Sequence, residues 1–160
     1  MEDKLQLYGE LGLGSRLKRL SDILMKEVQI VYNILDIDFD AYLFPIFKVI
    51  IDLEVATTTD IQEAIQYTQP AITQALKKLT DKKLVTYKID KLDKRKKIFK
   101  LSPKGKKIHQ QMLPLWSAID IQVKWLTEGS AANLMHHLTY IENQLKEKSL
   151  SQRILEKYNV

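Results

Sequence analysis

The chain lacks cysteine altogether, and its 160 residues include only five glycines and four prolines. The absence of cysteine excludes disulfides, thiolate nucleophiles, thiol-based redox sensing and cysteine-ligated zinc or iron–sulfur clusters. Long hydrophobic runs are also absent: the most apolar stretch, Ala41 to Ile51, is about half a membrane span and contains Pro45 and Lys48. The amino-terminal sequence MEDKLQLYGELGLGS lacks the charged-then-apolar order of a signal peptide. We therefore predict a cytoplasmic protein with no membrane partner.

Catalytic and metal-binding motifs are missing as well. The sequence has no glycine-rich phosphate loop, no G-x-S-x-G motif and no paired carboxylates in an obvious pocket sequence. Two of the three histidines, His136 and His137, are adjacent and would point about 100° apart on a helix, while His109 lies on another helix. These absences predict a protein that is not an enzyme and that has no metal site and no cofactor.

The basic residues are concentrated in one part of the chain. Between Lys77 and Lys107, fourteen Lys or Arg residues stand against three acids, an excess of eleven positive charges. The whole chain carries a net charge of +5, so the remainder of the sequence carries −6. A basic block in an otherwise acidic protein indicates a polyanionic partner, and the alternative is a solvated lysine-rich surface.

Two short helices are predicted just before this basic block. The first begins at Thr57 to Thr59, where a threonine cap satisfies free backbone N–H groups, and it runs to Ile65. After a tight connection, Thr68 and Pro70 open a second helix whose apolar positions recur every three or four residues up to residue 79. Its other face is polar and basic. This build is typical of a helix-turn-helix.

A basic hairpin follows the second helix. Residues 84–89 alternate between apolar and polar side chains, with Val85, Tyr87 and Ile89 on one face, which predicts a strand with one wet face. Residues 90–96 form a charged turn, and residues 97–101 return as a second strand. A hairpin in this position predicts the wing of a winged helix.

Apolar helices flank this central region. Helical spacing predicts one helix over residues 17–35, a short apolar helix over 41–54, and a long helix after the Ser102-Pro103 cap. Gly129 and Ser130 break the last of these, and apolar residues from Ala131 to Leu145 then recur as in a helix–helix seam. The predicted fold class is mainly α with a small β-wing. Dimerisation helices in residues 1–40 and 106–160 would flank a DNA-binding domain in residues 41–105, and a second copy of the chain would cover their apolar surface.

The residues of the wing resemble those of the MarR family, the multiple antibiotic resistance regulators. The family pattern is Asp-x-Arg, a short strand and then Leu-Thr/Ser-x-x-Gly, which Asp93-Lys94-Arg95 and Leu101-Ser102-Pro103-Lys104-Gly105 match in spacing and residue type. The likeness covers roughly residues 15 to 145. One departure is Leu84, preceded by Lys83, where many members have a glycine. The resemblance implies a homodimer that places its second helices in successive major grooves of a pseudo-palindromic operator, and many members are repressors released by a small ligand.

The expected partner is double-stranded DNA. Glutamine amides can donate to and accept from an adenine edge, whereas lysines on the same helix would hold phosphates without sequence preference. The alternative is that these exposed side chains only solvate the helix and the hairpin. The predicted DNA contacts are Gln69, Pro70, Thr73, Gln74, Lys77, Lys78, Lys88, Lys94, Arg95, Lys96 and Lys97.

Arg95 at the wing tip is the strongest single candidate for a DNA contact. A guanidinium is weakly hydrated and enters a narrow A·T minor groove more readily than an ammonium. Asp93 would orient Arg95 rather than touch DNA. The alternative is a surface ion pair worth less than about 1 kcal/mol.

A small aromatic or apolar effector is a further possible partner. Aromatic and apolar side chains that would line its pocket are Tyr32, Tyr42, Phe47, Met112 and Trp116. Such residues are more often core or dimer interface. A different function also stays open, a winged helix that contacts protein or RNA, although a protein-binding version has no need of so large a positive charge.

Overall fold

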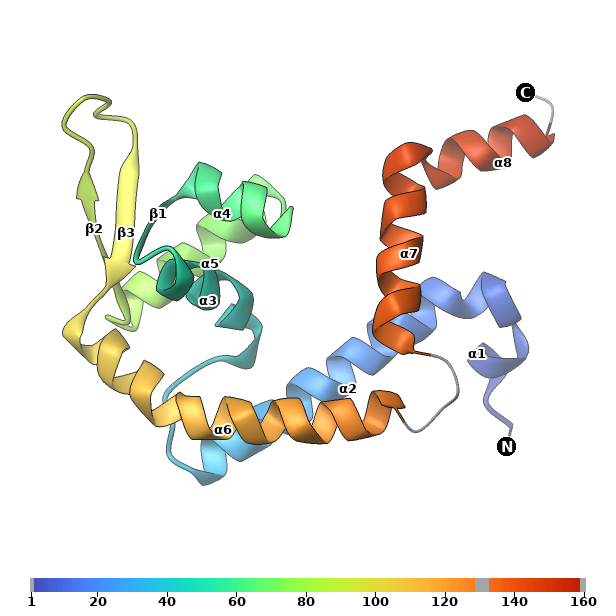
Figure 1. Cartoon of the computed structure of the whole chain (residues 1–160), viewed down its shortest axis with the longest axis horizontal. Helices are drawn as coiled ribbons and strands as arrows, with labels where there is room; N and C mark the ends of the chain where they lie inside the picture. Colours follow the sequence, from blue (N-terminus) through green and yellow to red (C-terminus); the bar gives the residue numbers. More distant parts are fainter. Residues whose placement is uncertain (1, 129–132, 159–160) are drawn as a thin grey trace. The chain divides into compact units, whose positions relative to one another are not determined.

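The computed structural model describes residues 2–128 and 133–158 and confirms a mainly helical fold with a small antiparallel sheet (Figure 1). The chain divides into two compact units, Met1–Met112 and Leu113–Val160. The amino-terminal helix, which we expected to serve dimerisation, thus lies in the same unit as the winged helix. The division into DNA-binding and dimerisation segments concerns function and stays a prediction.

The first unit begins with the short helix α1 (Lys4–Leu7), a 3-10 turn η1 (Gly9–Gly12) and the long helix α2 (Leu13–Ile34). The Asp3 carboxylate accepts a hydrogen bond from the N–H of Leu5 and pairs with the Arg19 guanidinium at 2.7 Å, which ties α1 to α2. α2 starts four residues before the helix expected from residue 17 and ends one residue before position 35.

Part of the core of the first unit lies where the carboxyl end of α2 meets the next two elements, the 3-10 turn η2 (Ala41–Leu43) and α3 (Phe44–Asp52). Pro45 lies in the first turn of α3, where its missing N–H costs nothing. Tyr32, Phe39 and Phe47 are buried, and their rings form a chain with centroid separations of 5.9 and 5.0 Å. This aromatic chain fixes α3 against the carboxyl end of α2.

The helix-turn-helix consists of α4 (Thr58–Ile65) and α5 (Gln69–Asp81). Thr57 and Asp60 cap α4 reciprocally, since the Thr57 hydroxyl accepts from the Asp60 N–H and the Asp60 carboxylate accepts from the Thr57 N–H. Gln66 takes a left-handed conformation at φ 55° to make the turn, and the Thr68 hydroxyl caps α5. Both predicted caps are present, with Thr57 as the cap of the first helix.

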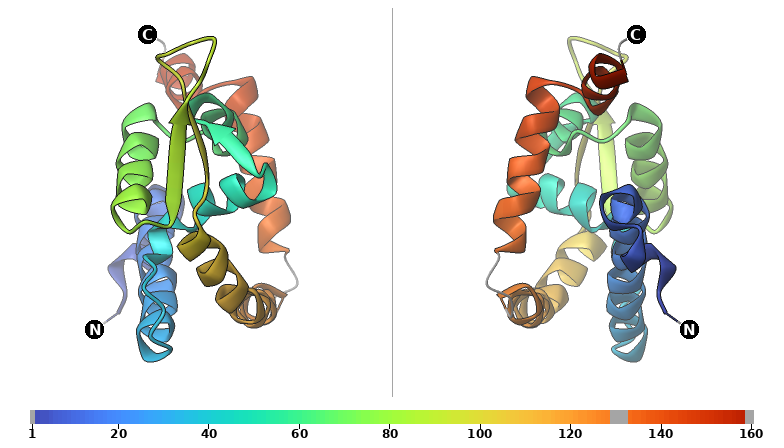
Figure 2. Two further views of the ribbon diagram at one scale, coloured as in Figure 1. Left: turned by 90° about the vertical axis from the view of Figure 1, so that its left-hand side faces the viewer. Right: turned by 90° about the vertical axis from the view of Figure 1, so that its right-hand side faces the viewer.

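The sheet contains the two predicted wing strands, β2 (Val85–Ile89) and β3 (Lys97–Leu101), and a third strand, β1 (Val55–Thr57), that we did not predict. The strand order is β1-β3-β2, with Ala56 opposite Phe99 and Tyr87 opposite Phe99 on the other side. In Figure 2, α5 lies on one side of the hairpin and β1 on the other. β1 therefore anchors the base of the wing to the start of α4.

The prediction that only one face of β2 is exposed to solvent is wrong for most of the strand. Val85 is 2% exposed, whereas Tyr87 is 43% and Ile89 is 56% exposed. The hairpin extends beyond the core, so only its base is covered. Figure 1 shows its turn at the end of the sheet away from the start of α6.

The helix α6 (Pro103–Glu128) follows the sheet directly. The Ser102 hydroxyl accepts from the Gly105 N–H at 2.9 Å and donates to the Lys83 carbonyl at 2.5 Å, so the predicted cap also joins α6 to the start of β2. A Cβ on Gly105 would lie 1.9 Å from the Leu84 carbonyl oxygen, so no larger residue fits there without a backbone shift. Lys83 has φ 58°, the left-handed conformation that glycine adopts most easily. At this position many MarR-family members have a glycine. This chain forms the same turn with a lysine whose backbone is strained.

The second unit contains the carboxyl-terminal part of α6, then α7 (Leu134–Glu147) and α8 (Leu150–Tyr158). Asn133 caps α7 through its side-chain oxygen. We did not predict a separate α8, and the expected break at Gly129 and Ser130, with Ala131 after it, lies outside the described residues. Among residues 2–128 and 133–158, no helix is long and apolar enough to span a membrane.

Candidate nucleic-acid interface

The amphipathic division of α5 determines which of its side chains can meet a ligand. Ile72, Ala75, Leu76 and Leu79 are buried against the domain. All six residues of α5 that we predicted as DNA contacts are exposed: Gln69, Pro70, Thr73, Gln74, Lys77 and Lys78. Burial of one stripe therefore fixes the orientation of a helix whose open face carries amides and ammonium groups.

Thr73 is the one residue of this face whose side chain is tied to its own helix. Its hydroxyl donates to the Gln69 carbonyl at 2.9 Å. The bond leaves the lone pairs of the hydroxyl oxygen and the methyl group to face outward. Thr73 can thus offer an acceptor or an apolar contact, such as the methyl of thymine, while its proton is in use.

Two aspartates shape the turn of the wing. The Asp90 carboxylate accepts hydrogen bonds from the N–H groups of Leu92 and Asp93 at 2.8 and 2.9 Å. The Asp93 carboxylate accepts from the Arg95 N–H at 3.0 Å and from Arg95 Nε at 3.2 Å. These bonds hold the pKa of both carboxyl groups below the usual value, Asp90 through its backbone donors and Asp93 through Arg95. Both aspartates are therefore charged at neutral pH and fix the backbone of the tip.

Arg95 is oriented by Asp93 yet almost entirely open, since its side chain is 92% exposed. The contact uses Nε, so the two terminal nitrogens of the guanidinium are available to a partner. Leu92, which the sequence analysis did not single out, is 98% exposed in the same turn. The turn of the wing therefore presents both a cation and an apolar side chain.

The strands of the wing carry the predicted contacts Lys88 and Lys97, and its turn carries Lys94 and Lys96; all four are exposed. Lys97 Nζ lies 4.4 Å from the centre of the Tyr87 ring, which in turn packs against Phe99. This cation–π contact keeps the ammonium group of Lys97 close to the sheet.

Part of the basic block is paired with acids from outside it. The segment between α2 and η2 contributes Asp38 and Asp40, which form ion pairs with Lys82 and Lys104 and with Lys78 respectively. The sequence analysis missed these acids as partners because they precede the lysines by about 40 residues or more. The predicted contact Lys78 is thus exposed but not unpaired.

The five residues predicted for an effector pocket do not share one environment. Tyr32, Phe47 and Met112 are at most 1% exposed and belong to the core, whereas Tyr42 is 57% exposed. Tyr42 lines a cavity of about 680 Å³ between α2 and residues 37–42, together with Gln29, Phe39 and Lys82. Trp116 belongs to the second unit. Effector binding stays a prediction.

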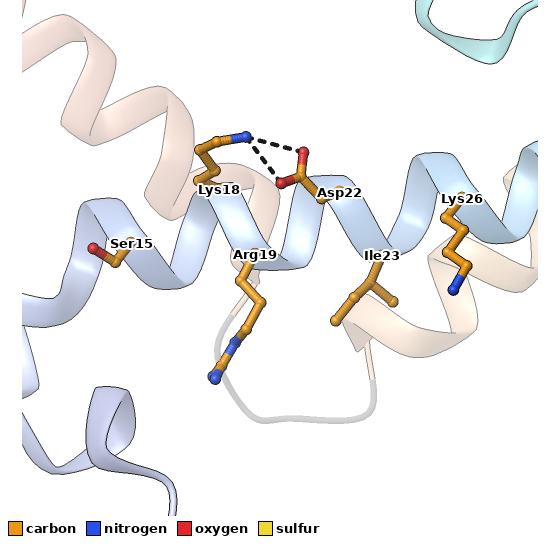
Figure 3. A pocket seen from close by; sticks show the side chains of 6 residues that line it. All are labelled: Ser15, Lys18, Arg19, Asp22, Ile23 and Lys26. Atoms are coloured by element: carbon orange, nitrogen blue, oxygen red, sulfur yellow. Dashed lines mark hydrogen bonds and ion pairs between the residues drawn. The ribbon is translucent and has the colours of Figure 1, made fainter.

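A second hollow of about 420 Å³ lies on α2 itself (Figure 3). Arg19, Ile23 and Lys26 project to one side over successive turns, while Lys18 and Asp22 pair with each other across one turn. Because Arg19 also pairs with Asp3, two of the three cations in this hollow already have acidic partners.

The histidines lie on two different helices. His136 and His137 neighbour each other on α7 with ring centroids 6.2 Å apart, and His109 lies on α6. In the described part of the chain, no three His, Cys, Asp or Glu residues are grouped so that they could hold a metal ion.

No protein-family model matches the sequence, and no curated protein matches it. Solved structures do match. A MarR variant from E. coli in complex with operator DNA is 22% identical, with a TM-score of 0.65 over 90% of this chain and 99% of that one. BpsR of Bordetella bronchiseptica, whose DNA binding is regulated by 6-hydroxynicotinic acid, is 20% identical, with a TM-score of 0.62 over 84% and 98% of the two chains.

A third match extends the likeness to a ligand complex. PcaV of Streptomyces coelicolor, a transcriptional regulator solved with its natural ligand, is 12% identical, with a TM-score of 0.65 over 88% of this chain and 94% of that one. These likenesses extend over most of each chain. The protein therefore has the winged helix-turn-helix fold of MarR-type transcriptional regulators.

Proposed function

We propose that this protein is a sequence-specific, DNA-binding transcriptional regulator of the MarR type that binds a pseudo-palindromic operator as a homodimer. Two observations together carry the proposal: the exposed face of α5 is rich in amides and basic groups, and an exposed arginine lies at the tip of a basic wing. Both belong to one compact unit, and we expect a single duplex to contact both. The role is regulatory and not enzymatic.

The chemistry of the two elements suits the two grooves of DNA. Gln69 and Gln74 on α5 present amides that can bond to base edges in the major groove, and Lys77 adds phosphate contact. Arg95, held by Asp93, would enter the adjacent minor groove, where a narrow A·T tract concentrates negative potential. The matched E. coli MarR variant was solved with operator DNA, which supports the same partner here.

Apolar surface outside the core supports the homodimer. On α2, Leu20 is 46%, Ile23 is 50% and Ile34 is 76% exposed. In the second unit, Trp125 is 73% and Ile154 is 53% exposed. Large apolar side chains thus recur on the surface of both units, and a second copy of the chain would cover them.

Release from DNA by a small ligand is part of the proposal, with a repressor as the expected mode. BpsR and PcaV, whose structures concern ligands, support it by likeness of fold. A winged helix that contacts protein or RNA is the second candidate. The exposed basic residues of α5 and of the wing favour duplex DNA over a protein partner.

Selection of bound duplexes from a random-sequence pool tests the proposal. We expect enrichment of an inverted repeat, and footprints that show two protected half-sites about one helical turn, roughly 10 base pairs, apart. A pool that shows no enrichment after repeated rounds would refute sequence-specific binding. Selection from single-stranded RNA in parallel would identify an RNA-binding winged helix instead.

Light scattering after size exclusion tests the assembly separately. We expect a mass of about twice the 18.6 kDa chain. A stable monomer at micromolar concentration would contradict the proposed architecture, whatever the DNA result.

A further inference from the structure

The acidic segment between α2 and η2, residues 36–40, is held in one conformation. Ile37 and Phe39 are buried. The Gln29 side chain donates to the Phe39 carbonyl at 3.1 Å and accepts from the Ala41 N–H at 2.9 Å. Alternation then directs Asp38 and Asp40 away from the core. Their carboxylates are therefore placed by a fixed backbone.

Asp40 faces the basic side of α5. One of its carboxylate oxygens accepts a hydrogen bond from the Tyr42 N–H at 3.0 Å, which caps η2, and the other lies 3.6 Å from Lys78 Nζ. The Asp40 side chain is 29% exposed and that of Lys78 is 53% exposed. The carboxylate is thus the fixed member of the pair, and the lysine bends towards it.

Asp38 engages two further lysines at the end of α5. Lys82 pairs with one carboxylate oxygen, and Lys104 of α6 lies 3.1 Å from the other. Lys104 also donates to the Lys82 carbonyl at 3.1 Å. The hydrogen bonds from Lys82 and Lys104 hold the pKa of Asp38 below its usual value, so the carboxylate is charged at neutral pH.

We propose that Asp38 and Asp40 mask positive charge at the base of α5 and thereby lower the sequence-independent affinity of the protein for DNA. The inference rests on the proposed DNA-binding function. Sequence-independent affinity comes from lysines and arginines that displace counterions from phosphates. A lysine that is paired with a protein carboxylate instead contributes less to this sequence-independent affinity. The exposed amides of α5 and Arg95 then supply a larger share of the binding.

Asp40→Asn removes one masking charge with little other change. Asparagine is as good a helix cap as aspartate, so the hydrogen bond from the Tyr42 N–H can persist. Asp22→Asn is the matched control: it also removes one negative charge, but its carboxylate pairs with Lys18 of the same helix and accepts from the Tyr42 hydroxyl at 3.5 Å, and not from a lysine of α5.

The readout is binding to a duplex without operator sequence, measured by fluorescence anisotropy at several salt concentrations. Release of Lys78 to a phosphate should steepen the slope of log K against log salt by about 0.9 for each protomer that contacts DNA. At about 0.1 M salt this corresponds to about eightfold tighter binding per protomer. Asp22→Asn should leave the slope unchanged.

Three results would overturn the inference. Equal salt slopes for Asp40→Asn and Asp22→Asn would mean that Asp40 does not mask Lys78. Weaker binding by Asp40→Asn would mean that Asp40 positions Lys78 for a phosphate. A wild-type protein that binds no duplex at all would remove the proposed function together with the inference, whereas the first two results leave that function intact.

Discussion

Replacement of Gly105 by alanine is a sharp test of how the wing is attached to α6. The added Cβ would lie 1.9 Å from the Leu84 carbonyl oxygen, where an ordinary contact is at least 3.4 Å, so the two backbones must separate by about 1.5 Å. That separation opens the hydrogen bond from the Ser102 N–H to the Leu84 carbonyl, now 3.0 Å, and strains the one from the Ser102 hydroxyl to the Lys83 carbonyl.

The expected loss in the free energy of unfolding follows from these changes. Two weakened hydrogen bonds cost about 1 kcal/mol each, and overpacking against backbone adds about 1–3 kcal/mol. Alanine in place of glycine within a helix returns about 1 kcal/mol. The net loss of about 2–4 kcal/mol should lower the melting temperature by roughly 5–15 °C for a chain of this size.

Differential scanning calorimetry of Gly105→Ala beside Gly14→Ala provides the comparison. A Cβ on Gly14, which lies in α2, meets nothing within 4 Å, so the same substitution there should raise the melting temperature by a few degrees through helix propensity. If Gly105→Ala melts at or above the wild-type temperature, the close approach of α6 to Leu84 is not a feature of the folded protein.

Three further predictions concern the turn, the wing tip and the acidic segment. Lys83→Gly should raise the free energy of unfolding by about 1 kcal/mol in urea titrations, because glycine adopts φ 58° without strain, and an unchanged midpoint would contradict that. Arg95→Ala should weaken operator binding by about 1–3 kcal/mol in mobility-shift titrations without a change in melting temperature, since the side chain is 92% exposed; equal binding would exclude the wing tip from the interface. The pKa of Asp38 is lowered by Lys82 and Lys104, so its contribution to stability is complete above the unfolded value of 3.8 and is lost as the pH falls through the lower folded value. The stability difference between wild type and Asp38→Asn should therefore shrink in urea titrations as the pH falls from about 5 to about 3, and a constant difference would show that the carboxylate is not charge-paired.

Local patterns predicted most of the helix-turn-helix and the wing. The apolar spacing of Ile72, Ala75, Leu76 and Leu79 predicted which face of α5 is buried, and the Thr68 cap is present. Such features depend on residues within one or two turns of each other, which is why the sequence alone carries them. The strand over residues 97–101 has the predicted bounds for the same reason.

Features that depend on distant residues were missed. β1 has only three residues, too few to show a period of two, and it exists because it pairs with β3 more than 40 residues later. The pairing of Asp38 and Asp40 with lysines of α5 and α6 likewise depends on the fold and not on spacing. Periodicity cannot separate buried aromatic residues from pocket residues either: Phe47, a candidate pocket residue by sequence, is buried in the structure, and its role in an effector pocket stays a prediction.

The salt dependence of duplex binding tests the central claim most directly. Fluorescence anisotropy of the wild-type protein with a selected operator duplex, between about 50 and 300 mM salt, should show log K falling linearly with log salt, with a slope set by the phosphates that α5 and the wing contact. The absence of binding at about 50 mM salt, or an affinity that does not change with salt, would contradict the claim that these basic elements form a DNA-binding surface.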